Sequence, residues 1–332
     1  MTTYSVRPLG SRSADFLTAN AQVLSIAAFF VACCVFFSVA ADAFPTTGNL
    51  LNLLRQSAPI LIVAVAMTFV ITTGGIDLSV GSTVALINAL AAIALRAGLP
   101  WPIVVVAMLG IGAVVGLLQG WFVAYQRIPS FIVTLAGLSV LRGVALLLTQ
   151  GFSIPIASEG WFTQIGRGWF LGIPMPAVLA LLAVAGGAIV LSQTRYGRQV
   201  IAVGANAEAA RRVGMPAQKV VASVYILTGA AAALAGIIVA ARLSSGSSNA
   251  AVGFELDVIA AVVLGGTSLM GGRGTILGTT LGALTIAVIG NGLILSHISP
   301  FFTQIVTGAI ILVAIWLNTR IFTRLGTRRL AS

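Results

Sequence analysis

The sequence is short of charged residues and of the side chains that perform catalysis. Only 8% of its 332 residues are Asp, Glu, Lys or Arg, whereas soluble domains carry about 25%. A water-soluble fold could not cover its surface with so few charges. The chain has one histidine, His297, and two adjacent cysteines, Cys33 and Cys34. These are too few ligands for a metal site, and we interpret the two thiols as buried.

Lysine is almost absent, which excludes one class of enzyme. The single lysine, Lys219, is followed by valine, so no Gly-Lys-Ser/Thr phosphate-binding loop exists and the chain cannot be a P-loop ATPase. An intramembrane enzyme would need a base beside a nucleophile, or several metal ligands. A single histidine makes both arrangements improbable in this sequence. We therefore expect no catalytic residues, no metal and no cofactor bound by this chain.

Long apolar runs are what the sequence has in abundance. Stretches without charge cover residues 16–41, 97–126 and 274–319, and a transmembrane helix needs roughly 20 such residues. Uninterrupted runs of this length exclude a barrel of alternating strands. The sequence thus predicts an all-α polytopic membrane protein of about ten transmembrane helices, at 20–42, 57–74, 79–96, 101–125, 130–149, 175–194, 219–241, 257–271, 275–295 and 301–321.

This pattern also predicts the domain organisation. We expect an N-terminal tail at 1–19, a transmembrane domain at 20–322 that includes a loop at 195–219, and a C-terminal tail at 323–332. The first apolar run is longer than the core of a signal peptide, so we interpret it as a retained span. Residues 127–133 and 298–306 resemble each other, which suggests either an inverted repeat of helices 2–5 and 7–10 or a chance match.

The basic residues predict the orientation. The net charge of +11 would suggest nucleic acid in a soluble protein, but here the cations mark one face of a membrane. With the N-terminus inside, thirteen lie on the inner side and four on the outer side. Both termini are therefore expected in the cytoplasm, and Arg142 falls within the fifth helix. The inner residues are Arg7, Arg12, Arg127, Arg195, Arg198, Arg211, Arg212, Lys219, Arg273, Arg320, Arg324, Arg328 and Arg329, and the outer ones are Arg55, Arg96, Arg167 and Arg242.

The loop at 195–219 has helix signals of its own. Asn206 is a candidate N-cap, Glu208 would lie in the first turn, and Gly214 would end the helix. We expect a short surface helix over 207–213. Such a helix either docks a partner or rests on anionic headgroups as a basic connector.

Acidic residues are rare enough to be considered one by one. Asp77 lies in a turn between two spans, flanked by Gly74, Gly75 and Gly81. It caps the helix that follows or acts as a gate on a path through the membrane. Glu255 and Asp257 stand near the outer end of the 257–271 helix, where they favour its dipole or contact an external protein.

Uncharged polar residues within the spans are candidates for lining a path for a neutral solute. Hydrogen bonds between helices explain most such residues in any bundle, so we expect fewer than half of them to touch a solute. The polar candidates are Asn88, Gln119, Thr134, Ser139, Thr267, Ser268, Asn291 and Gln304.

Glycines at four-residue spacing form a ridge for helix packing at Gly112, Gly116 and Gly120.

Three motifs resemble one known family. Residues 208–214 (EAARRVG) are similar to the coupling loop of bacterial ATP-binding-cassette import permeases. Residues 74–82 (GGIDLSVGS) and 255–274 (ELDVIAAVVLGGTSLMGGRG) narrow the resemblance to the ribose-type permeases, which also serve xylose, arabinose and galactose. The resemblance extends from about residue 45 to residue 320.

The resemblance implies an inner-membrane permease subunit that translocates a monosaccharide, with ribose as the first expectation. It implies a separate cassette ATPase that binds ATP and Mg, an extracytoplasmic binding protein, and a second permease subunit. The alternative is an ion-coupled secondary transporter of a small polar solute, for which Asp77 would be the coupling acid. By the resemblance, the residues that couple to the ATPase are Asn206, Glu208, Ala209, Ala210, Arg211, Arg212 and Gly214. The candidate path residues, chosen for their polar side chains, are Asp77, Asn88, Thr267, Ser268 and Asn291.

Overall fold

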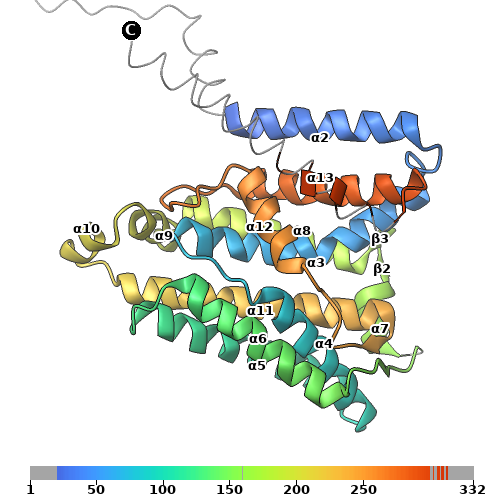
Figure 1. Cartoon of the computed structure of the whole chain (residues 1–332), viewed down its shortest axis with the longest axis horizontal. Coiled ribbons are helices and arrows are strands. Elements are labelled where there is room, and N and C mark those ends of the chain that lie inside the picture. Colours follow the sequence, from blue (N-terminus) through green and yellow to red (C-terminus); the bar gives the residue numbers. More distant parts are fainter. Residues whose placement is uncertain are drawn as a thin grey trace, which may run out of the picture.

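The computed structural model confirms the all-α fold expected from the apolar runs (Figure 1). It describes residues 21–158 and 160–299, together with positions 302, 305, 306, 308, 309 and 312. The long helices are α2 (Ala21–Ala40), α3 (Thr47–Thr72), α4 (Val80–Arg96), α5 (Trp101–Ala124), α6 (Ser130–Thr149), α8 (Met175–Gln193), α11 (Ala217–Leu243) and α13 (Ile276–Leu295).

Shorter elements connect these helices at the two ends of the bundle. Helices α9 (Arg195–Ala205) and α10 (Ala207–Arg212) lie at one end, which we call the α10 end. Helix α7 (Trp161–Arg167) lies at the opposite end (Figure 1). Two antiparallel pairs of very short strands accompany α7. One joins β1 (Ile154–Pro155) to β4 (Ser245–Gly246), and the other joins β2 (Trp169–Phe170) to β3 (Ile173–Pro174).

Fewer helices than expected are long enough to cross a membrane. Among the described residues, seven are long and apolar enough, and α4 is a shorter apolar helix of 17 residues. The expected helix at 257–271 is wrong in extent, because α12 (Phe254–Leu264) has only 11 residues, about 16 Å of helix against a hydrocarbon core of about 30 Å. The expected count of ten is therefore not confirmed.

Glycine explains why α12 stops early. Gly266, Gly271 and Gly272 have φ angles of 89°, 78° and 75°, and this left-handed region of backbone space cannot continue a right-handed helix. The tenth expected helix, at 301–321, lies outside the described residues except for six isolated positions. The proposed inverted repeat includes that helix, so it stays a prediction.

Helix α3 begins earlier than the sequence predicted. The expected span started at residue 57, after Arg55, but the helix starts at Thr47 and Thr46 caps it by accepting a hydrogen bond from the Asn49 backbone amide. Arg55 thus lies within the helix, nearer its N-terminal end. The thiols of Cys33 and Cys34 also differ from expectation, because both are half-buried on α2 rather than buried.

Helices α3 and α11 form the centre of the bundle. Their most apolar windows are 78% and 67% buried, against 22% for α5, 11% for α6 and 17% for α8. The perimeter helices expose large apolar side chains such as Val106 and Leu147, which suits contact with lipid. The expected glycine ridge of α5 packs within the chain, since a Cβ at Gly112 or Gly116 would meet backbone atoms of α11.

Candidate functional site

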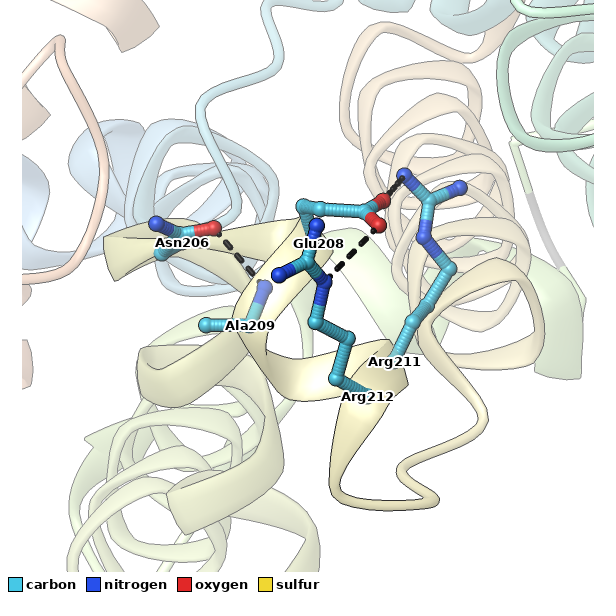
Figure 2. A network of polar contacts seen from close by, with 5 residues as sticks. All are labelled: Asn206, Glu208, Ala209, Arg211 and Arg212. Carbon is cyan, nitrogen blue, oxygen red and sulfur yellow. Dashed lines mark hydrogen bonds and ion pairs between the residues drawn. The ribbon is translucent and has the colours of Figure 1, made fainter.

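The short helix α10 forms where the sequence predicted it (Figure 2). The Oδ1 atom of Asn206 accepts a hydrogen bond of 2.9 Å from the Ala209 amide, which caps the helix. The Glu208 carboxylate pairs with Arg211 at 2.8 Å and with Arg212 at 3.4 Å. Gly214, with φ of 82°, ends the helix.

Helix α10 presents most of its side chains to solvent. Ala210 is 4% exposed and faces the bundle, whereas Glu208, Ala209, Arg211 and Arg212 are all exposed. The charged face therefore points away from the protein. Because both ion pairs are exposed, they contribute little to stability, and the charges are free to meet another surface.

Helix α9 attaches α10 to the two central helices. Val200 and Val203 are buried in the core, and the Tyr196 ring stacks on Phe69 of α3 at a centroid distance of 6.4 Å. Gly204 lies against the backbone of Thr72, where a Cβ would collide with the carbonyl oxygen. Burial raises the pKa of the Tyr196 phenol. The α9–α10 pair is thus held tightly to the bundle.

Asp77 organises the turn between α3 and α4. Its Oδ1 atom accepts hydrogen bonds from the backbone amide of Ser79 at 2.9 Å and from the Ser79 hydroxyl at 2.7 Å. The Gln119 amide of α5 reaches the same hydroxyl at 2.7 Å, and Asp77 itself is 2% exposed. Asp77 therefore fixes the turn before α4 through Ser79, the N-cap residue of that helix. Its role as a gate stays a prediction.

Residues 244–253 connect α11 to α12 and lie against the middle of α4 and α6. Asn88 of α4 bonds the backbone at Ser245 and Ser247. Arg142 of α6 donates to the carbonyls of Ala250, at 2.8 Å, and Ala251, at 3.4 Å, as well as to that of Ser248. Asn88 and Arg142 thus satisfy backbone polar groups of this non-helical segment, which is the condition under which such backbone is tolerated within a membrane.

A large cavity lies between α3, α12 and α13. Its volume is about 740 Å³, within the range of about 300–1,000 Å³ typical of small-molecule sites. Asp257, in the first turn of α12, and Asn291 of α13 both line it. Asn291 also exchanges hydrogen bonds of 3.0 and 3.1 Å with Asn49. The apolar lining thus carries few polar groups, an arrangement that can hold a neutral polar solute.

The cavity gathers only some of the candidate path residues. Asn291 lines it, and so does Asp257, which the sequence suggested as an external contact. Asn88 and Asp77 instead hold backbone segments in place. Thr267 is 3% exposed, and it lies with Ser268 in the glycine-rich turn after α12. Gln56 and Ser57 also line the cavity. Nothing in the sequence marked them, because Gln56 precedes the expected helix at 57–74 and Ser57 is its first residue.

The apolar helices of membrane-spanning length, the buried central pair and the large cavity fit a multi-pass membrane transport protein. The family described as "Branched-chain amino acid transport system / permease component" matches residues 49–315. The chain belongs to this permease family.

Several relatives align along most of the chain. It is 41% identical over 290 residues to the "Ribose import permease protein RbsC" of Haemophilus influenzae, covering 86% of this chain and 88% of the relative. It is 41% identical over 282 residues to the "Probable ABC transporter permease protein YphD" of Escherichia coli, covering 85% of each. It is 34% identical to the "Xylose transport system permease protein XylH" of Escherichia coli, covering 90% of this chain and 92% of the relative. No solved structure matches the chain.

Proposed function

We propose that this chain is the membrane-spanning subunit of an ATP-binding-cassette importer that carries a monosaccharide into the cytoplasm. The observation that carries the proposal is the connection between α10 and the cavity. The exposed helix is fixed through α9 to α3, and α3 also lines the cavity. A partner that moves α10 would therefore move a wall of the solute site.

The partner at the α10 end is a cassette ATPase, which binds ATP and Mg in its own chain. Asn206, Glu208, Ala209, Ala210, Arg211, Arg212 and Gly214 form the segment that it contacts. The excess of basic residues in this part of the sequence supports a cytoplasmic position for the α10 end and for both termini. A binding protein delivers the solute at the opposite end, and a second permease subunit completes the assembly.

The solute is a pentose or a similar neutral sugar. Two of the relatives are named for ribose and xylose, and the cavity offers amide, hydroxyl and carboxylate groups at Gln56, Ser57, Asp257 and Asn291. These groups bond hydroxyls without the multiple charges that would trap a solute. In this proposal Asp77 and Asn88 hold the path walls, and Thr267 and Ser268, in the turn after α12, line the continuation of the path towards α10.

Reconstitution into proteoliposomes tests the proposal. The chain is combined with its ATPase and binding protein, and uptake of labelled ribose and xylose is measured with ATP, with a non-hydrolysable analogue, and with an imposed proton or sodium gradient. The proposal expects uptake only with hydrolysable ATP. Uptake driven by an ion gradient without ATP would instead establish a secondary transporter.

A further inference from the structure

Three arginines from separate elements converge at the end of the bundle opposite α10. Arg55 lies on α3, Arg167 ends α7, and Arg242 lies in the last turn of α11. Together they line a cavity of about 500 Å³, which they share with Asn52, Gln56 and Leu243. Positive charge is thus concentrated around one hollow.

Backbone carbonyls and an aromatic ring hold the three side chains in place. Arg55 donates to the Arg167 carbonyl at 3.5 Å, and Arg167 Nε donates to the Arg242 carbonyl at 2.8 Å. The Arg55 guanidinium also lies 4.8 Å from the centre of the Trp169 ring. These contacts orient the guanidinium groups but supply no negative charge.

No carboxylate among the described residues forms an ion pair with these arginines, since the two ion pairs there both belong to Glu208. Two guanidinium nitrogens, Arg55 Nε and Arg242 Nη1, are moreover buried without a hydrogen-bond partner. A buried charged donor without a partner is costly, and like charges in one hollow repel each other. An anion that entered the hollow would relieve the repulsion among the three guanidinium groups.

We infer that Arg55, Arg167 and Arg242 form a binding site for an oxyanion such as a phosphate group. Guanidinium groups match the geometry of phosphate and carboxylate oxygens and bind them through paired hydrogen bonds. The volume is ample for one such group, and the exposed Arg167 guanidinium, which donates to a carbonyl only through Nε, has further donors for it. Sequence reasoning placed these residues on the outer side but gave no reason for them to meet.

The position of the site favours an anion from the aqueous phase over a lipid headgroup. Arg55 and Arg242 belong to the two central helices of the bundle, whereas lipids surround the perimeter. Gln56 lines both this hollow and the large cavity. A bound anion would therefore sit beside the entrance to the solute site.

Thermal unfolding of the full chain in nanodiscs tests this inference. The melting temperature is measured in phosphatidylcholine nanodiscs with increasing potassium phosphate, against potassium chloride at equal ionic strength, and again in nanodiscs that contain phosphatidylglycerol. The variants are Arg242→Gln and Arg167→Gln, the second of which changes an exposed side chain and should fold even if the first does not. Arg96→Gln is the control, because Arg96 is an exposed arginine at the same end.

We expect phosphate to raise the melting temperature of the wild type and of Arg96→Gln in a saturable way. The variants in the hollow should need about tenfold more phosphate for the same effect. A rise that occurs only with phosphatidylglycerol, and that Arg167→Gln removes, would identify the headgroup as the source of the oxyanion. No rise with either anion, or the same rise in Arg167→Gln as in Arg96→Gln, would overturn the inference.

Discussion

Tyr196 of α9 and Ser223 of α11 share a hydrogen bond of 2.7 Å. Ser223 gives its own hydroxyl proton to the Val220 carbonyl, at 2.8 Å, so the Tyr196 phenol is the donor. The Tyr196 ring stacks on Phe69 of α3. One side chain therefore joins the α9–α10 pair to both central helices.

Replacing Tyr196 with phenylalanine should weaken transport without releasing the ATPase. Tyr196→Phe keeps the ring on Phe69 but removes a hydrogen bond that contributes about 1 kcal/mol. We expect slower ATP-driven uptake at an unchanged yield of the copurified ATPase. Tyr125→Phe, at an exposed tyrosine, is the matched control, and equal uptake rates in the two variants would argue against this link.

Exchanging the charges on α10 should disrupt ATPase binding. The double variant Glu208→Arg with Arg212→Glu keeps the net charge and the pair four residues apart but inverts the pattern that the exposed face presents. Because exposed pairs contribute only about 0–1 kcal/mol, the fold should be unaffected. We expect the yield of copurified ATPase to fall severalfold, as measured by affinity purification from membranes.

The control for this exchange is Arg96→Glu, an exposed arginine at the other end of the bundle. It should leave the ATPase bound. Full recovery of ATPase with the α10 double variant would show that these charges do not contact it.

Filling the large cavity should block transport while preserving the fold. Gly290 lines the cavity and has no atom within 4 Å of the position of an added Cβ. Gly290→Leu therefore adds bulk without a clash at the Cβ, and helix propensity favours it by roughly 0.8–1 kcal/mol. We expect a melting temperature equal to or above that of the wild type and a large loss of uptake.

Gly110 of α5 provides the matched control, since it also has open space around an added Cβ but lies on the exposed perimeter. Gly110→Leu should retain uptake. Normal uptake by Gly290→Leu would place the solute path elsewhere.

Arg142 should be necessary for the position of residues 244–253. Arg142→Gln removes hydrogen bonds from a charged donor to three backbone carbonyls. We expect a loss of roughly 2–4 kcal/mol in the free energy of unfolding and faster proteolysis within this segment. Arg142→Lys should be intermediate because lysine lacks the forked geometry, and a melting temperature for Arg142→Gln equal to that of Arg96→Gln would contradict this role.

Local signals predicted most of the helices well. The helix at 130–149 has the expected bounds, and α10 begins after Asn206 because the capping interaction involves residues only three apart. The length of the apolar run predicted the end of α12 poorly. The run continues past Leu264, but the helix ends there because the glycines that follow adopt left-handed backbone angles. The expected helix began after Arg55, because a charged side chain was taken to mark the end of an apolar span. Arg55 instead lies within α3, close enough to the helix end to contact Trp169 and Arg167.

The candidate sites were less predictable because they depend on contacts between distant segments. Asp257 and Asn291 share a cavity through the packing of α12 and α13 on α3. The partners of Arg142 are backbone carbonyls more than a hundred residues away, and a carbonyl carries no signal in the sequence. The convergence of Arg55, Arg167 and Arg242 likewise depends on three elements meeting at one end.

Cysteine labelling at position 208 tests the central claim, that α10 faces the cytoplasm and receives the force of an ATPase. Glu208→Cys is made in a background where Cys33 and Cys34 are replaced by alanine, and a membrane-impermeant maleimide is applied to intact cells and to inside-out vesicles. We expect labelling in the inside-out vesicles only. Labelling of residue 208 in intact cells would put α10 outside the cell, beyond the reach of any cytoplasmic ATPase, and would contradict the account.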